Sequence, residues 1–325
     1  MDALTDLARI VGEDLPRCHA LILARMDSPV ALIPQLAAHL VAAGGKRLRP
    51  LLTLAAARLC GYEGIRHIRL AACVEFIHTA TLLHDDVVDE SQLRRGLASA
   101  NAVFGNTASV LVGDFLFARA FQLMVEDGNL RVLEILSAAA ATIAEGEVLQ
   151  LETQNDLSTP VSRYLEVIGG KTAALFAAAC EVGAVVAERP AEEAHALREY
   201  GVDLGMAFQL VDDALDYTAD QATLGKTVGD DFREGKITLP VLAAYAKGDA
   251  EERAFWVRTI EASEQRPTDL ERAMTLIGAR GAIEATLDRA AGFAAAAQRA
   301  LAPFPDSEAR RALAAVADYT VSRAS

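Results

Sequence analysis

Apolar side chains recur at helical spacing along most of this chain. Residues 51–83 are apolar nearly all round except for a polar centre, which predicts two helices that are buried on most of their faces. Two or three further helices are expected after residue 236, and no segment shows the sustained alternation of a β-strand. Similar helical stretches are predicted at 111–124, 130–151, 172–186 and 191–217.

Glycine, proline and short polar residues mark the breaks between these stretches. None of the breaks is long enough to be an interdomain linker, so we expect residues 1–325 to form a single all-α domain. The predicted loops are Gly44-Gly45, 127–129, 158–160, Gly169-Gly170 and 224–235.

Composition narrows the possible functions. The 325 residues are 52% apolar but only 6% aromatic, which favours a helical core over an all-β fold. A net charge of −14 argues against a general nucleic-acid binder, whose surface would be basic. Small anionic substrates remain compatible with this charge, provided that metal ions or local lysines and arginines neutralise them.

Cysteines and the N-terminus indicate the compartment. The cysteines show no CxxC pairing and lie in apolar surroundings, so we expect buried free thiols: Cys18, Cys60, Cys73 and Cys180. The N-terminus lacks the basic and apolar regions of a signal peptide. The longest uncharged run, 96–113, contains several polar residues that a membrane span would not favour. A cytoplasmic protein without stable membrane insertion is expected.

Two acidic motifs stand out, each behind a strongly apolar stretch. Both match DDxxD, the first at 85–89 and the second at 212–216. On a helix, the first and last aspartates of each motif share a face, and like charges at this spacing repel unless a cation lies between them. Carboxylate oxygens suit Mg²⁺, which typically binds one or two carboxylates together with water and substrate phosphates. Chance predicts only about 0.1 DDxxD matches in a chain with this aspartate content, so two solvated acidic helix ends are the weaker interpretation.

Basic residues lie where an anion would need them. The segment GGKRLRP, 44–50, places cations after a flexible turn at the start of a helix, where free N–H groups also favour anions. Arg94 and Arg95 follow the first acidic motif closely. Lys171 and Lys226 each lie beside a glycine, but neither belongs to a GxxxxGK phosphate loop, so nucleotide hydrolysis is not indicated.

Taken together, these motifs resemble the trans-prenyltransferases, the polyprenyl diphosphate synthases. The resemblance covers roughly residues 40–245 in consistent order through GGKRLRP, HDDVVDESQLRRG, GKT, FQLVDDALDY and LGKTVGDDFREGKITLP. It implies about ten or more helices around a central cavity, usually in a homodimer. The implied reaction joins isopentenyl diphosphate to an allylic diphosphate such as farnesyl diphosphate, with two or three Mg²⁺ ions when substrate is bound.

The same resemblance implies roles for individual residues. Mg²⁺ ligands are expected at Asp85, Asp89, Asp212 and Asp216. Contacts with the allylic diphosphate are expected from Arg94, Lys171, Thr172, Gln209 and Lys226, and contacts with isopentenyl diphosphate from Lys46, Arg49 and Arg95. His78 is also expected to bind substrate. The residues expected to carry catalysis are Asp85, Asp89, Lys171, Asp212 and Lys226. Arg323, near the chain end, is expected to lie in a solvated tail.

Product length is expected to depend on the helix that precedes the first motif. Ala80 and Thr81 lie one turn before Asp85, and a small side chain there favours a medium or long product. The surrounding sequence looks most like octaprenyl, nonaprenyl and decaprenyl synthases, which supply quinone side chains. Phe115, Phe121 and Met124 are predicted for the floor of the product tunnel.

Several alternatives share parts of this pattern. A shorter-chain farnesyl or geranylgeranyl synthase would keep the motifs and differ only in product length. A class I terpene cyclase or head-to-head synthase normally lacks the GGKRLRP segment and carries a different second metal motif. A non-catalytic partner subunit of a heteromeric synthase usually loses one of the two acidic motifs. A purely structural helical protein would need neither the acidic motifs nor the basic residues.

Overall fold

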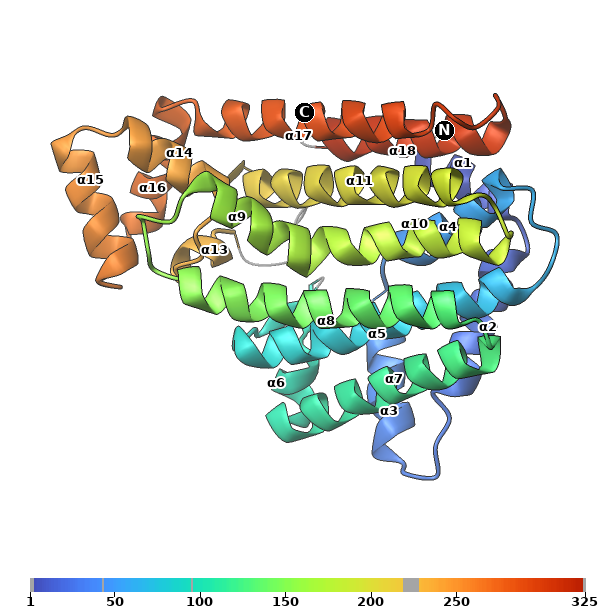
Figure 1. The fold of residues 1–325 in the computed structure, drawn as a ribbon. Coiled ribbons are helices and arrows are strands. Elements are labelled where there is room, and N and C mark those ends of the chain that lie inside the picture. The colour runs from blue at the N-terminus through green and yellow to red at the C-terminus, as the bar shows by residue number, and fades with distance from the viewer. Residues whose placement is uncertain (1–2, 43, 95, 219–227, 324–325) are drawn as a thin grey trace. The chain divides into compact units, whose positions relative to one another are not determined.

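The computed structural model describes residues 3–42, 44–94, 96–218 and 228–323, most of which are helical (Figure 1). The strands described are two residues each, β1 (Leu93–Arg94) and β2 (Leu97–Ala98), which pair antiparallel. The expected all-α fold is therefore confirmed.

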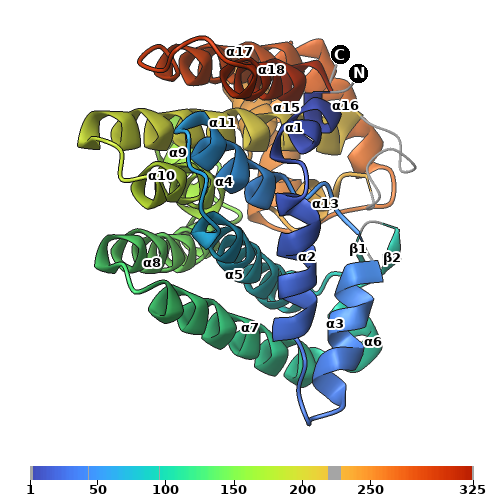
Figure 2. The same cartoon turned by 90° about the vertical axis from the view of Figure 1, so that its right-hand side faces the viewer.

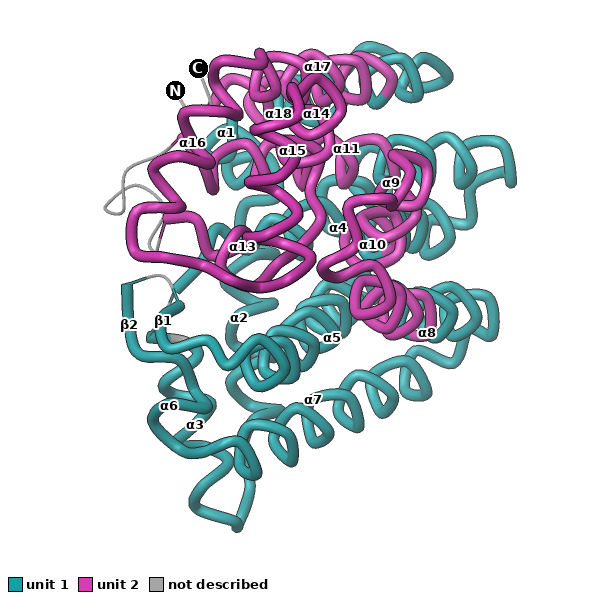
Figure 3. Tube along the Cα trace, turned by 90° about the vertical axis from the view of Figure 1, so that its left-hand side faces the viewer, with its two compact units in different colours: residues 1–140, 175–201, 297–316 teal, residues 141–174, 202–296, 317–325 magenta. Residues whose placement is uncertain are grey.

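The chain divides into two compact units (Figure 3). Unit 1 comprises Met1–Ala140, Leu175–Gly201 and Ala297–Val316, and unit 2 comprises Ala141–Ala174, Val202–Ala296 and Ala317–Ser325. Some helices contribute residues to both units: α8 (Leu130–Thr153), α10 (Ala174–Val186), α11 (Ala191–Thr218), α17 (Ala282–Ala300) and α18 (Glu308–Ser322).

Unit 1 is built around α5 (Arg66–Val88), which packs against α2, α4 and α7 (Figure 2). Most of α5 is buried, in keeping with its apolar sequence, and Val88 in its last turn is exposed. Its other complete elements are α1 (Ala3–Val11), α2 (Asp14–Arg25), α3 (Leu32–Ala42), α4 (Leu48–Leu59), α6 (Ala100–Phe104) and α7 (Asn106–Asp127).

A buried ionic cluster joins the N-terminal end of α5 to α2 and α4. His67 lies 2.9 Å from an Asp14 carboxylate oxygen, to which Arg58 also donates at 2.5 Å. Although burial alone would raise the pKa of Asp14, hydrogen bonds from His67 and Arg58 lower it. Burial lowers the pKa of His67 by more than its contact with Asp14 raises it.

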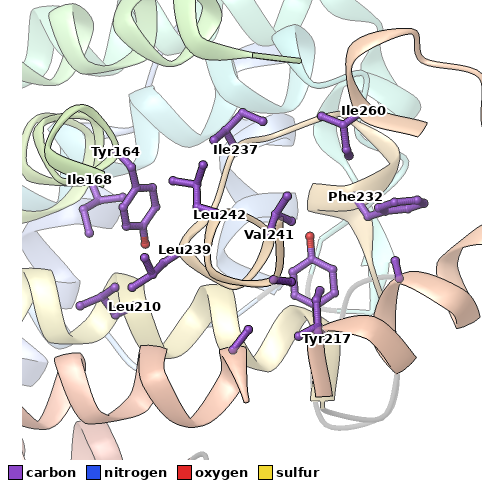
Figure 4. Close-up of a cluster of buried hydrophobic side chains, with 14 of the residues drawn as sticks. Tyr164, Ile168, Leu210, Tyr217, Phe232, Ile237, Leu239, Val241, Leu242 and Ile260 are labelled. Atoms are coloured by element: carbon purple, nitrogen blue, oxygen red, sulfur yellow. The ribbon is translucent and has the colours of Figure 1, made fainter. Parts of the chain in front are cut away.

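Unit 2 consists largely of short helices around α11. They are α9 (Val161–Ile168), the π-helix η1 (Gly169–Ala173), α13 (Asp230–Arg233), α14 (Leu239–Lys247), α15 (Ala250–Trp256), the π-helix η2 (Val257–Glu261) and α16 (Asp269–Ala279). Their apolar side chains form one core cluster, in which Tyr164 and Ile168 of α9 lie near Leu210 of α11 (Figure 4). Trp256 is completely buried in the same cluster.

Most of the predicted helices are confirmed to within a few residues. Stretch 51–83 resolves into α4 and α5, and stretches 111–124, 130–151 and 191–217 correspond to α7, α8 and α11. The expectation of two or three helices after residue 236 was too low, because α14 to α18 and η2 all lie there. Breaks at Gly248, Pro267 and Gly281 divide that region into shorter pieces than its apolar pattern suggests.

The loop predicted at Gly169-Gly170 was wrong. Both glycines lie in η1, which continues α9 into α10 without a break. A Cβ at Gly170 would lie 3.1 Å from Gly146 Cα and 3.2 Å from the carbonyl oxygen of Thr142, both on α8. Gly170 therefore serves a close approach of two helices, and its lack of a side chain, rather than its flexibility, explains its presence.

The cysteine prediction is confirmed: Cys18, Cys60, Cys73 and Cys180 are free and buried. Burial raises the pKa of the Cys18 and Cys60 thiols to about 12. Two helical segments, 106–127 and 161–186, are long and apolar enough to cross a membrane by length and composition alone. Within their most apolar windows, 39% and 78% of the residues are buried, respectively.

Candidate active site

The first acidic motif lies at the C-terminal end of α5. Asp85 is in its last turn, Asp89 is its C-cap residue, and both are half-buried. The N–H of Asp89 donates to the carbonyl of Asp85 at 2.8 Å, so the two residues stay on successive turns of one face. A helix C-terminus carries negative partial charge, and the last turn of α5 contains no basic residue. The motif therefore concentrates negative potential where a cation would be stabilised.

The second aspartate of this motif has a different role. Asp86 is 2% exposed, and its carboxylate accepts hydrogen bonds at 2.5–2.9 Å from the Arg94 guanidinium. Its carbonyl accepts from Asn101 Nδ2 at 3.0 Å. Arg94, expected to contact the allylic diphosphate, is thus held beside the motif by an ion pair with Asp86.

Helix α7 supports the same end of α5. His84 Nε2 lies 3.2 Å from the Val110 carbonyl oxygen and 3.5 Å from Asp114 Oδ1, and its ring stacks on Phe117. A Cβ at Gly113 would lie 2.2 Å from His84 Nε2, so this close contact depends on glycine. The residue immediately before Asp85 is therefore fixed in place by its neighbours on α7.

Two of the residues expected to bind substrate meet in unit 1. Arg49 Nη1 lies 3.1 Å from His78 Nε2, and the guanidinium lies over the Phe176 ring at 4.5 Å. Lys46 is exposed in the turn before α4. Arg95 lies outside the described residues.

Arg47, between these cations, has a structural role. It is the N-cap residue of α4 in the left-handed region, with φ 47°, and its guanidinium pairs with the buried Glu75. The GGKRLRP segment therefore divides its cations by place: Arg47 anchors the turn to α5, Arg49 meets His78, and Lys46 is exposed.

The second acidic motif lies near the end of α11 in unit 2. Asp212 is half-buried, and its Oδ1 forms an ion pair with Arg323 Nη2 at 2.7 Å. Asp216 is fully buried, and its carboxylate accepts from the Asp231 N–H at 3.1 Å. The expectation that Arg323 lies in a solvated tail was wrong: its side chain is 16% exposed and lies over the Phe208 ring at 4.2 Å.

Asp213, between these two aspartates, is 3% exposed. Tyr164 donates to its Oδ2 at 2.5 Å, and Gln209 Nε2 donates to its Oδ1 at 2.8 Å. Burial raises the pKa of Asp213 to about 8, with a further contribution from the nearby Asp231 carboxylate. Both hydrogen bonds oppose this rise because they favour the charged form.

Predicted diphosphate contacts of unit 2 lie on η1 and α11. Lys171 Nζ donates to Glu147 Oε2 at 2.6 Å and to Gln150 Oε1 at 2.9 Å, both on α8. Thr172 Oγ1 donates to Gln209 Oε1 at 2.8 Å, which links Thr172 through Gln209 to Asp213. Lys226 lies outside the described residues.

Sequence reasoning missed several residues that contact the predicted site: Glu147, Gln150, Tyr164 and Arg323. Glu147 and Gln150 are three residues apart on α8 and therefore share a face. Tyr164 lies on α9 and contacts Asp213 on α11, a pairing that no sequence spacing indicated. No pattern in the sequence identified Arg323.

The residues predicted to control product length lie on α5 and α7. Ala80 is completely buried, while Thr81 is half-buried and donates its hydroxyl to the His78 carbonyl at 2.8 Å. Phe121 is 44% exposed on α7, which does not fit a place in the floor of an enclosed tunnel. Met124, in contrast, is buried.

The donor set fits magnesium bound together with a substrate. Within the described residues, no group of three or more His, Cys, Asp or Glu side chains could hold a metal ion by itself. Mg²⁺ often takes only one or two carboxylates and completes its coordination with water and substrate phosphates. The half-buried Asp85 and Asp89, at the negative end of α5, provide such a pair.

Comparison with known proteins agrees with this chemistry. Residues 30–277 match the model of the family described as Polyprenyl synthetase. The chain is 48% identical to the octaprenyl diphosphate synthase of Escherichia coli (strain K12) over 98% of this chain and 99% of that protein. It is 43% identical to the geranyl-diphosphate-specific all-trans-nonaprenyl-diphosphate synthase of Rhodobacter capsulatus, with 96% of each chain covered.

Solved structures give the same result. A polyprenyl synthase from Caulobacter crescentus CB15, complexed with calcium and isoprenyl diphosphate, is 56% identical with a TM-score of 0.97, covering 99% of this chain and 98% of the other. A decaprenyl diphosphate synthase from Rhodobacter capsulatus is 55% identical with a TM-score of 0.95, covering 99% of both chains. The motifs, the helical fold and these similarities together establish that the chain belongs to the polyprenyl synthetase family.

Proposed function

We propose that this protein is a Mg²⁺-dependent trans-prenyltransferase that extends an allylic diphosphate with isopentenyl diphosphate. The observation that carries this proposal is the pair Asp85 and Asp89 at the C-terminal end of α5, where the helix dipole adds to their negative charge. Calcium and isoprenyl diphosphate are bound in a relative of 56% identity, which supports a metal–diphosphate ligand.

The side chains of this chain would act by binding and positioning. Asp85, Asp89, Asp212 and Asp216 would hold the magnesium ions. When bound, magnesium supplies positive charge that stabilises the departing diphosphate and so favours ionisation of the allylic C–O bond. Lys171 would add its own positive charge to a departing diphosphate.

The second substrate needs its own anion site. Arg49 and His78 meet at 3.1 Å on α4 and α5, and Lys46 lies nearby in sequence at the turn before α4. These groups would hold isopentenyl diphosphate so that its double bond attacks the allylic cation. No covalent nucleophile is required, and the released diphosphate would accept the proton that leaves.

We further propose a long all-trans product that supplies quinone side chains. The proteins named octaprenyl, nonaprenyl and decaprenyl synthase match almost the whole chain, which supports this product class. The small Ala80 on α5 agrees with it, since a bulky residue one turn before the metal site would shorten the space for a growing chain. A shorter farnesyl or geranylgeranyl product is the alternative.

We also propose that the working form is a cytoplasmic homodimer of single-domain subunits. Helix α7 presents a stripe of exposed apolar residues: Val110, Leu111, Ala118, Phe121 and Val125. Exposed apolar residues that gather on one helix are more typical of a protein interface than of a surface in contact with solvent. Replacing Leu111 and Val125 by glutamate should give monomers in sedimentation experiments. Val30→Glu, at an exposed apolar position outside the stripe, is the matched control.

The proposed function is tested by incubating the protein with Mg²⁺, labelled isopentenyl diphosphate and farnesyl diphosphate. A product ladder ending at eight to ten isoprene units is expected. A stop at three or four units would keep the reaction class and replace the product class. No incorporation by the folded protein would refute the enzyme and favour a non-catalytic partner subunit.

A further inference from the structure

Unit 2 contains a directed chain of hydrogen bonds that begins in its apolar core. Tyr164, from α9, donates to Asp213 Oδ2, and Gln209 donates to Asp213 Oδ1. Thr172, from η1, donates to Gln209 Oε1. The chain thus connects three helical elements, α9, η1 and α11, through side chains alone.

The direction of each bond follows from the groups that meet at Asp213. The Tyr164 hydroxyl and the Gln209 amide N–H both donate to Asp213, one to each carboxyl oxygen. With its NH₂ group turned toward Asp213, Gln209 presents its carbonyl oxygen to Thr172, whose hydroxyl must then donate. The orientation of Gln209 and Thr172 is therefore set by Asp213.

The Tyr164 end of this chain is rigid. The Tyr164 side chain is 2% exposed and belongs to the apolar cluster of unit 2, where Ile168 and Leu210 are neighbouring members (Figure 4). The hydrogen bond from the Tyr164 hydroxyl to Asp213 is short, at 2.5 Å. Tyr164 therefore holds one oxygen of Asp213 while Gln209 holds the other.

This arrangement separates the aspartates of the second motif by role. Asp213 accepts from Tyr164 and Gln209, whereas Asp212 and Asp216 make different contacts. We propose that Tyr164 is a positioning residue for the active site: by holding Asp213 it orients Gln209 and Thr172 and leaves Asp212 and Asp216 to serve the metal. The proposal rests on the prenyltransferase function proposed above.

Tyr164→Phe tests the proposal because it removes one hydroxyl and keeps the ring. Outer residues that orient site groups typically contribute 10–100-fold to activity or metal affinity, and we expect kcat to fall by about that factor. Tyr200→Phe is the matched control: Tyr200 is also fully buried, but its hydroxyl donates to the Leu313 carbonyl in unit 1. Both variants should lose similar stability in denaturant, and only Tyr164→Phe should lose activity.

A double-mutant cycle adds a readout that a structural role would not produce. Asp213→Asn replaces an acceptor by a group that also donates, so Gln209 can no longer be held in one orientation. If Tyr164 acts through Asp213, the double variant should be no slower than Asp213→Asn alone. Fully additive losses, or equal losses in Tyr164→Phe and Tyr200→Phe, would overturn the proposal.

Binding measurements keep this proposal separate from the enzyme function. Calorimetry with inorganic diphosphate and Mg²⁺ should show weaker binding to Tyr164→Phe than to Tyr200→Phe. If the wild-type protein binds this pair but forms no product, the proposed reaction fails while the positioning role is still measured. Equal affinities of the two variants would refute the positioning role even if the wild-type protein is an active synthase.

Discussion

Replacing Gly146 by alanine tests how the close approach of α8 and η1 positions Lys171. A Cβ at Gly146 would lie 2.5 Å from Lys171 N and 2.8 Å from Gly170 C. Both are backbone atoms and cannot rotate away. Ordinary van der Waals contact begins near 3.4 Å, so the two helices must separate by about 0.9 Å at this point.

That separation should affect stability and catalysis differently. Overpacking typically costs about 1–3 kcal/mol, while alanine in place of glycine in a helix gains about 0.5–1 kcal/mol. A shift near 1 Å in a group that positions substrate can cost about 100-fold in rate. Because Lys171 would move relative to Glu147 and Gln150 on α8, we expect a large loss of kcat/KM with only a modest loss of stability.

Gly292→Ala is the matched control for this experiment. Gly292 lies on the exposed face of α17, and a Cβ there would meet no atom within 4 Å. The control should gain stability and keep wild-type kinetics, whereas Gly146→Ala should be about 1–3 kcal/mol less stable than the control in urea denaturation. If Gly146→Ala matches Gly292→Ala in both stability and kcat/KM, the close contact does not position Lys171.

Three further outcomes are expected. Burial lowers the pKa of His67, so His67 takes up a proton when the protein unfolds at mildly acidic pH. Its contribution to the free energy of unfolding is therefore complete above about pH 6.5 and is lost as the pH falls. Urea denaturation at pH 8 and pH 5.5 should show this loss, and equal stability at the two pH values would contradict it. Arg323→Gln removes the 2.7 Å ion pair of Asp212, so calorimetry without substrate should show tighter Mg²⁺ binding than in the wild type. Equal or weaker binding would show that Arg323 does not compete with Mg²⁺ for Asp212. Ala80→Phe should shorten the product measured by chromatography, and an unchanged product length would remove Ala80 from the length determinants.

The helices and the acidic motifs were predictable because both depend on short-range spacing. Apolar residues at helical intervals placed α11 almost at its observed bounds and predicted two helices where α4 and α5 lie. The same spacing predicted that Asp85 and Asp89 share a face. Which aspartate enters the core was not predictable, because it depends on how each helix is rotated against its neighbours. In both motifs the second aspartate is among the buried residues, with Arg94 as partner of Asp86.

The partners of the site residues were less accessible to sequence reasoning. The contact between Lys171 and Glu147 requires knowing that η1 crosses α8 at Gly146. From the sequence alone, Gly169-Gly170 was predicted to be a loop, because a pair of glycines usually interrupts a helix. Arg323 follows α18 with no periodic signal, and only the tertiary fold brings it to Asp212.

The charges of unit 2 indicate how metal and substrate would bind to this site. Lys171 is paired with Glu147 at 2.6 Å, and Asp212 is paired with Arg323 at 2.7 Å. A diphosphate that arrived alone would have to draw Lys171 away from Glu147, and a metal ion alone would have to displace Arg323. Breaking either pair leaves a partly buried charge without its partner, which is costly. A ligand that carries both charges offers each released group an opposite charge, so Mg²⁺ and diphosphate should each strengthen the binding of the other.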